Sequence, residues 1–162
     1  MQFPEVCGTV PIDQFYVQGN GTARRSRGKR QNISEAEKRS FIMDKKILLV
    51  DDAAFMRMMI KDALTKNGYT NILEAADGEI ACATYAAEKP DLIIMDITMP
   101  NKTGIEALRD IKASDPGAKI VMCSAMGQES MVVEAIKLGA LDFIVKPFKA
   151  DRILQTVQKV LG

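Results

Sequence analysis

The stretch "KILLVDDAAF", residues 46–55, joins a continuous apolar run to two adjacent carboxylates, Asp51 and Asp52. A short run that is apolar at every position is typical of a strand buried on both faces of a parallel sheet. The two aspartates then have two interpretations. They belong to a solvated turn, where Asp is common for its turn chemistry, or they stand at a functional site. The residues that the rest of the chain places beside them decide between the two.

Composition limits the class of protein. The chain has 162 residues, of which 47% are hydrophobic and 27% charged, which suits one globular domain with a core. Residues 1–42 hold seven Lys/Arg against four Asp/Glu, and the remainder holds fifteen against seventeen. The slightly acidic remainder disfavours nucleic acid as a partner. Three widely spaced cysteines and the lack of histidine disfavour a disulfide framework or a zinc site and favour the cytoplasm.

The first 42 residues differ from the rest. They are rich in Gly, Ser, Asn and charge without a periodic apolar face, so we predict a mostly disordered basic extension over 1–42. Its basic run at residues 24–30 has two interpretations. It is a tail that binds nucleic acid or a membrane surface, or, as we expect, a solvated extension. The sequence "MDKKILLVDD" also has the character of a natural start, so Met43 is a candidate initiator and the extension a candidate non-native translation. Neither a membrane span nor a secretory signal is expected.

From residue 43 onward, short apolar runs alternate with helical patterns. The runs are "KILLV", "NILEA", "DLIIM", "KIVMC" and "LDFIV". Met56, Ile60 and Leu64 recur at helical spacing, and further helices are predicted over 79–89, 128–138 and 150–161, among others. Five such units predict an α/β domain over 43–162, a flavodoxin-like (βα)5 doubly wound parallel sheet in strand order 2-1-3-4-5.

This architecture brings five polar side chains to one rim. In open α/β sheets the functional crevice lies beyond the carboxyl ends of the strands. The first strand ends at Asp51 and Asp52, the third at Asp96, the fourth at Ser124 and the fifth at Lys146. Three carboxylates, one hydroxyl and one ammonium group are therefore predicted to converge.

The chemistry of this set suggests phosphoryl transfer. Clustered carboxylates raise each other's pKa unless a cation lies among them, and Mg²⁺ suits oxygen ligands beside a phosphoryl group. An Asp carboxylate can attack such a group to form an aspartyl phosphate. Mg²⁺ and the Lys146 ammonium would balance charge on the phosphoryl oxygens, and the Ser124 hydroxyl would donate to one of them.

Four motifs in one order resemble a known family. The pair "DD", then "MDITMPNKTG", "MCSAMG" and "GALDFIVKPF", resembles the receiver domain of two-component response regulators over residues 45–161. The resemblance implies that Asp96 is the phosphoacceptor and takes its phosphoryl group from a histidine kinase. It implies a Mg²⁺ site made of Asp52, Asp96, the backbone carbonyl of Thr98 and, largely through water, Asp51.

The resemblance also assigns roles around the phosphoacceptor. It implies that Ser124 is the switch hydroxyl, that Lys146 binds the phosphoryl group and that Phe143 is the aromatic that follows the switch. It further implies a cis peptide bond before Pro147 and a structural role for Gly104. Taken alone, these residues have plainer interpretations: a polar strand end, a surface lysine and a core aromatic.

The resemblance is greatest to single-domain chemotaxis regulators. It implies a cytoplasmic monomer that catalyses only its own phosphorylation and dephosphorylation. The implied partners are a CheA-like histidine kinase, a FliM-like flagellar switch protein and a possible phosphatase. The implied output surface is formed by the predicted helix over 128–138, the fifth strand "LDFIV" and the predicted helix over 150–161. It lies near Lys137, Ala140, Phe143 and Lys149.

Two other functions stay open. One is a phosphorelay intermediate that passes phosphate to a histidine phosphotransferase. The other is a Mg²⁺-dependent phosphatase of the haloacid dehalogenase type, which is disfavoured because that family needs a second Asp where this chain has Thr98. A last expectation concerns Met56, Met58 and Met59, which suit a soft partner surface but are expected mostly to pack in the core.

Overall fold

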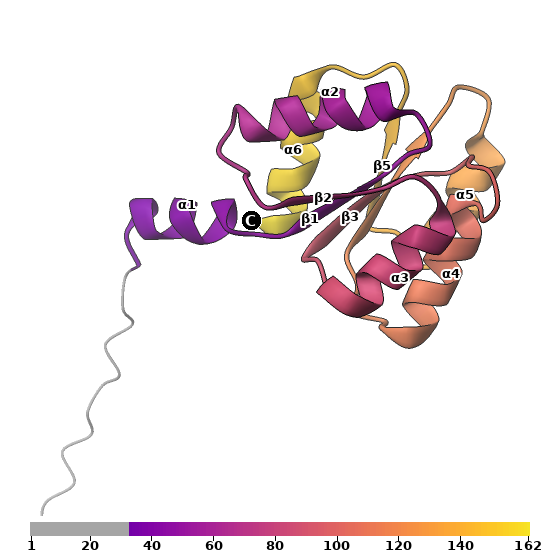
Figure 1. Cartoon of the computed structure of the whole chain (residues 1–162). Coiled ribbons are helices and arrows are strands. Elements are labelled where there is room, and N and C mark those ends of the chain that lie inside the picture. The colour runs from indigo at the N-terminus through magenta and orange to yellow at the C-terminus, as the bar shows by residue number, and fades with distance from the viewer. Residues whose placement is uncertain (1–32) are drawn as a thin grey trace, which may run out of the picture. The chain divides into compact units, whose positions relative to one another are not determined.

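The computed structural model describes residues 33–162, which form one unit (Figure 1). Most of the predicted basic extension, including its run at residues 24–30, lies outside the described residues. Within residues 33–162, no helix has the length and apolar character needed to cross a membrane.

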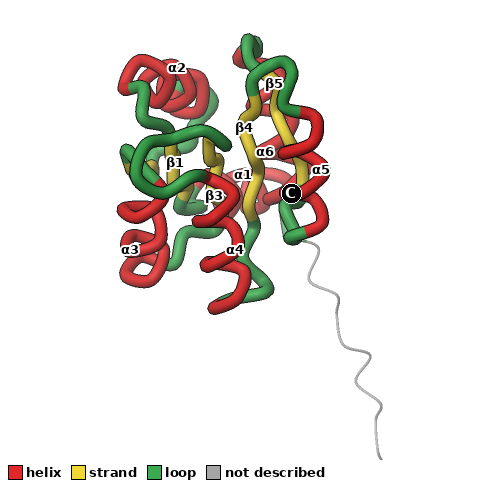
Figure 2. The backbone as a smooth tube through the Cα atoms, turned by 90° about the vertical axis from the view of Figure 1, so that its right-hand side faces the viewer, coloured by secondary structure: helices red, strands yellow, loops and turns green. Residues whose placement is uncertain are grey.

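Five parallel strands form one sheet in the order β2-β1-β3-β4-β5, which confirms the predicted fold class. Figure 2 shows β3 between β1 and β4 in this sheet. The strands are β1 (Ile47–Val50), β2 (Ile72–Ala75), β3 (Leu92–Asp96), β4 (Ile120–Ser124) and β5 (Asp142–Val145). In the register of the sheet, Val50 of β1 lies opposite Met95 of β3. The residues that directly follow them, Asp51 and Asp96, are therefore neighbours at the carboxyl edge.

Helices cover both faces of the sheet. The helices α2 (Ala54–Thr65) and α6 (Ala150–Leu161) pack on one face, and α3 (Gly78–Glu88), α4 (Gly104–Ser114) and α5 (Glu129–Lys137) pack on the other (Figure 1). In β1, Leu48 and Val50 belong to the core under α3, α4 and α5, whereas Ile47 and Leu49 belong to the core under α2 and α6. Burial on both faces explains why the strand sequences are continuously apolar.

One helix lies where the sequence predicted none. Helix α1 (Glu35–Met43) falls inside the predicted disordered extension except for its last residue, and none of its residues is buried. A capping box starts it, because the Glu37 N–H donates to the Ser34 hydroxyl while the Glu37 carboxylate accepts the Ser34 N–H at 2.8 Å. The sequence carries this signal as Ser-x-x-Glu, but without an apolar face behind it the pattern did not indicate a helix.

The expectation that the methionines of α2 pack mostly in the core was wrong. Met58 is 52% exposed and Met59 40% exposed, beside Phe55 at 64%. The reason is helical geometry, since α2 turns Ile60 and Leu64 toward the sheet and so points positions 58 and 59 away from it.

Gly104 allows α4 to begin against the strand that carries Asp96. Its N–H donates to the Ile97 carbonyl oxygen at 2.9 Å, and Thr103 caps the helix through a capping box with Glu106. A Cβ atom at position 104 would overlap the backbone carbonyl oxygen of Asp96. A backbone atom cannot rotate away as a flexible side chain can, so any larger residue displaces either α4 or the end of β3.

We therefore expect Gly104→Ala to lower the free energy of unfolding by about 3 kcal/mol, at the upper end of the usual cost of overpacking. Urea denaturation measures this. Gly117→Ala is the matched control, because a Cβ there would meet only the end of the Asp115 side chain. Equal stabilities for the two variants would contradict the assigned close approach.

Candidate functional site

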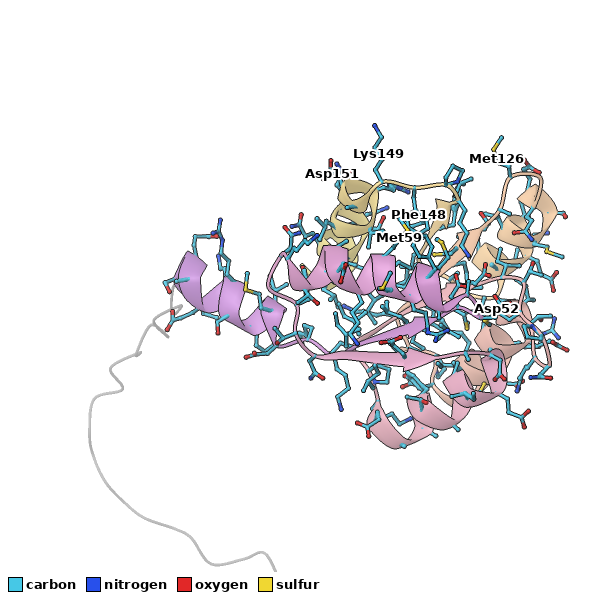
Figure 3. All side chains as sticks on the ribbon, turned by 45° about the horizontal axis from the view of Figure 1, so that its top comes forward. Asp52, Met59, Met126, Phe148, Lys149 and Asp151 are labelled. Atoms are coloured by element: carbon cyan, nitrogen blue, oxygen red, sulfur yellow. The ribbon has the colours of Figure 1, made fainter. Side chains whose placement is uncertain are left out.

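Three carboxylates meet at the carboxyl edge of the sheet. Asp51 and Asp52 follow β1, and Asp96 is the last residue of β3. One oxygen from each lies within 4.8 Å of the others. Asp51 is 3% exposed and Asp96 8%, whereas Asp52 is exposed (Figure 3). The structure thus brings together the three carboxylates that the sequence predicted to converge.

Local hydrogen bonds set the direction of the Asp51 side chain. One Asp51 carboxylate oxygen accepts the Ala53 N–H at 2.9 Å, which turns the chain from β1 into α2. Arg57, one turn into α2, donates from Nη1 to the Asp51 carbonyl oxygen at 2.6 Å and also pairs with Glu74 of β2. Sequence reasoning missed Arg57, because its position within a helix gives no sign that it reaches back to the preceding loop.

Lys146 connects the carboxylates. Its Nζ lies 2.6 Å from Asp51 Oδ2 and 3.3 Å from Asp96 Oδ2. The backbone N–H of Lys146 donates to the Ser124 carbonyl oxygen at 2.7 Å, so the end of β5 is joined to the end of β4. The Lys146–Pro147 peptide bond is cis. With a side chain only 21% exposed, Lys146 does not fit the plain interpretation of a surface lysine.

Burial and charge shift the pKa values of this cluster. Burial raises the pKa of Asp96. The negative charge of Asp51 raises this pKa further, whereas the Lys146 ammonium lowers it. Burial would by itself lower the pKa of Lys146, but the hydrogen bond to Asp51 and the charge of Asp96 outweigh it and raise that pKa. Lys146 is therefore held as a cation beside a carboxylate that is costly to keep charged.

The donor set fits a hard divalent cation. Three carboxylates and one ammonium carry a formal charge of minus two, and every ligand atom that Asp51, Asp52 and Asp96 offer is oxygen. Mg²⁺ is usually bound by one or two carboxylates together with waters and phosphate oxygens. Thr98, whose backbone carbonyl is the third predicted protein ligand after Asp52 and Asp96, lies two residues beyond Asp96 on the loop that follows β3.

Ser124 and Phe143 both line a groove beside the carboxylates. Ser124 ends β4 and is 1% exposed, whereas Phe143 of β5 is 37% exposed and so is not simply a core aromatic. The groove has a volume of about 790 Å³ and lies between β5, helix α5 and the loop after β4. Its other lining side chains are mostly apolar and include Val132, Val133 and Ile136.

One residue at this rim was missed by sequence reasoning. Gln128 was predicted only to begin a helix, but its side chain hydrogen-bonds to the Thr98 hydroxyl and to the Ala125 N–H, both at 2.7 Å. The sequence contains no signal for these contacts, because the loops after β3 and β4 come close to each other only when β3 and β4 pair in the folded sheet.

A buried aspartate ends the third strand, beside an acidic pair and a lysine that directly follows the fifth strand, as the four motifs predicted. The family model described as "Response regulator receiver domain" matches residues 47–158, and the chain belongs to this family. It is similar to the chemotaxis protein CheY of Bacillus subtilis, with 59% identity over 120 residues, 74% of this chain and 100% of that protein.

Two further comparisons agree. The chemotaxis protein CheY of Thermotoga maritima is 56% identical over 118 residues, which cover 73% of this chain and 98% of that protein. Among solved structures, the receiver domain of NtrX from Brucella abortus superimposes with a TM-score of 0.68 at 35% identity, covering 72% of this chain and 98% of that one. The resemblance inferred from the four motifs is thereby confirmed, and receiver domains bind Mg²⁺ at an acidic pocket such as this one.

The bridging role of Lys146 predicts a stability that depends on divalent cations. We expect Lys146→Met to lower the free energy of unfolding by about 2 kcal/mol in EDTA at pH 7, because two buried carboxylates lose their counter-charge. Added Mg²⁺ should stabilise the variant more than the wild type, since the ion no longer competes with an ammonium group. Urea denaturation with and without Mg²⁺ measures both effects.

Lys61→Met is the matched control, because Lys61 pairs with Glu74 in an exposed contact whose loss is expected to cost no more than about 0.5 kcal/mol. A loss for Lys146→Met that is equally small, or that Mg²⁺ leaves unchanged, would contradict the charge balance described above.

Proposed function

We propose that this protein is a response regulator that accepts a phosphoryl group from a histidine kinase onto Asp96. The observation that carries the proposal is the placement of the buried Asp96 carboxylate 3.3 Å from the Lys146 ammonium and within a cluster of three carboxylates. A nucleophile of this kind needs its charge balanced before an anionic phosphoryl group can approach it.

The transfer forms one bond and breaks one. An Asp96 oxygen attacks the phosphorus atom of the kinase phosphohistidine, the P–N bond breaks, and its electron pair stays on the imidazole nitrogen. Lys146 then exchanges part of its contact with Asp51 and Asp96 for a phosphoryl oxygen, and the Ser124 hydroxyl donates to another. Mg²⁺, held by Asp51, Asp52, Asp96 and the Thr98 carbonyl, would supply further neutralisation of charge on the phosphoryl oxygens.

Loss of the phosphoryl group is a hydrolysis of the same acyl phosphate. Water attacks phosphorus, the bond to Asp96 breaks, and the carboxylate and inorganic phosphate are released. The domain therefore returns to its starting state with only its own carboxylate having been modified. This cycle is that of a signalling protein and not of a metabolic enzyme.

Chemotaxis is the process that the similarity to the CheY proteins favours, with a flagellar switch protein as the partner. The groove beside Ser124 is the surface on which we place this partner. Its wall carries the exposed side chains of Val133, Ile136 and Phe143, which suit the apolar face of a peptide segment. Because Ser124 and Phe143 both line the groove, a shift of either changes the shape of the groove.

The phosphoacceptor is tested by labelling. We expect the wild type to gain one phosphoryl group from acetyl phosphate in the presence of Mg²⁺, as intact mass measures, and Asp96→Asn to gain none. The amide lacks the nucleophilic oxygen anion, although its size is the same. Asp91→Asn, which changes an aspartate at the opposite end of β3, is the control and should label as the wild type does. Labelling of Asp96→Asn at the normal rate would refute the proposal.

The output surface is tested by binding to the N-terminal segment of a flagellar switch protein. We expect tighter binding by the phosphorylated protein, and loss of at least about tenfold in affinity for Ile136→Glu, since one buried apolar side chain is worth that much. Ile80→Glu is the matched control, because Ile80 is also 45% exposed but lies on α3, away from the groove.

Isothermal calorimetry measures these affinities. Equal losses for the two glutamate variants would remove the groove from the interface. Failure of a fully phosphorylated sample to bind at all would instead favour a phosphorelay intermediate, with the chemistry at Asp96 unchanged.

A further inference from the structure

The side chain of Gln128 joins the two loops that flank the phosphoacceptor. Its Oε1 accepts the backbone N–H of Ala125 at 2.7 Å, and its Nε2 donates to the hydroxyl oxygen of Thr98 at 2.7 Å. Ala125 directly follows Ser124 at the end of β4, and Thr98 lies two residues beyond Asp96. Because a backbone N–H only donates, the Ala125 contact fixes which end of the carboxamide faces Thr98. We refer to these two hydrogen bonds as the Gln128 latch.

The position of Gln128 would also allow its side chain to cap a helix. Gln128 is the N-cap residue of α5, yet its side chain makes no capping hydrogen bond. At the same position Asp77 caps α3 and Thr103 caps α4. Met126, two residues earlier, is 79% exposed and projects away from the domain (Figure 3). The exposed tip of this loop is therefore held to the rim by the latch and not by burial of its apolar side chain.

We propose that Gln128 is a positioning residue that holds the loop after β4 in its unphosphorylated arrangement and so opposes phosphorylation of Asp96. This inference rests on the proposed function. The Ser124 carbonyl and the Ala125 N–H belong to one planar peptide unit, which moves as a rigid body. Any movement of the Ser124 backbone toward a phosphoryl group on Asp96 therefore also displaces the Ala125 N–H, which the latch restrains.

The other side of the same peptide unit is held by a different contact. The Ser124 carbonyl oxygen accepts the Lys146 N–H at 2.7 Å, so the unit is fastened to β5 at one end and to the loop after β3, through Gln128 and Thr98, at the other. Lys146 is itself expected to shift toward a phosphoryl group, so its contact can move with the switch. The latch is tied instead to the loop after β3, and it resists displacement of the Ala125 N–H.

The first test compares labelling rates. Gln128→Leu removes both hydrogen bonds at nearly constant size, and we expect acetyl phosphate with Mg²⁺ to phosphorylate it about fivefold faster than the wild type, the factor expected for one ordinary hydrogen bond. Thr98→Val, which removes only the hydroxyl and keeps the backbone carbonyl, should also label faster. The double variant should be no faster than Gln128→Leu alone, because both changes break one latch. Gln158→Leu, an exposed glutamine on α6, is the control and should label at the wild-type rate.

The second test reads the latch without any phosphodonor. Hydrogen exchange of the Ala125 amide, followed by NMR, should be about fivefold faster in Gln128→Leu than in the wild type and unchanged in Gln158→Leu, since a lost ordinary hydrogen bond is worth about that factor. Unchanged Ala125 exchange, or labelling of Gln128→Leu no faster than that of the wild type, would overturn the inference. A wild-type protein that takes no phosphoryl group would overturn the proposed function, and with it the regulatory role of Gln128, while Ala125 exchange would still report the contact itself.

Discussion

The ammonium group of Lys146 between the carboxylates of Asp51 and Asp96 is the contact on which the site depends. Asp51 and Asp96 lie at the ends of adjacent central strands, so their separation follows from strand pairing, and two buried negative charges at that spacing repel strongly. Lys146, which directly follows β5, offsets part of this repulsion. The same residue ties β4 to β5 through its backbone N–H, so the charge balance and the end of the sheet are held together.

The fold could be predicted from the sequence because its strands are buried on both faces. A continuous apolar run as short as "KILLV" indicates a strand that is covered on both sides, and once five such runs alternate with helices the right-handed crossover leaves little freedom of topology. The rim then followed, because Asp51, Asp96, Ser124 and Lys146 each end or directly follow a strand in a parallel sheet, and parallel strands end at one edge. These residues were predicted by position and their chemistry suggested phosphoryl transfer, whereas the choice of Asp96 as the phosphoacceptor came from the family resemblance.

Two kinds of feature could not be predicted from the sequence. One is a contact between loops that are distant in the chain, and the other is a helix whose sequence has no periodic apolar pattern. Gln128 reaches Thr98 across two loops that are 30 residues apart in the chain, and nothing in its local sequence indicates that contact. Helix α1 begins with a capping box but buries no apolar face, so the periodicity on which helix prediction rests is absent. The exposure of Met58 and Met59 shows the opposite failure, since apolar residues were assigned to the core although the helix turns them outward.

The contact between Lys146 and Asp51 also has a consequence for the order of events during synthesis. Its two partners are separated by 95 positions in the chain, the longest separation of any side-chain hydrogen bond among residues 33–162. A nascent chain that has emerged only as far as β4 already carries the acidic pair and Asp96 but lacks the lysine that balances them. The complete site therefore exists only once nearly the whole domain has left the ribosome. If Asp96 is the phosphoacceptor proposed above, an unfinished protein therefore cannot signal.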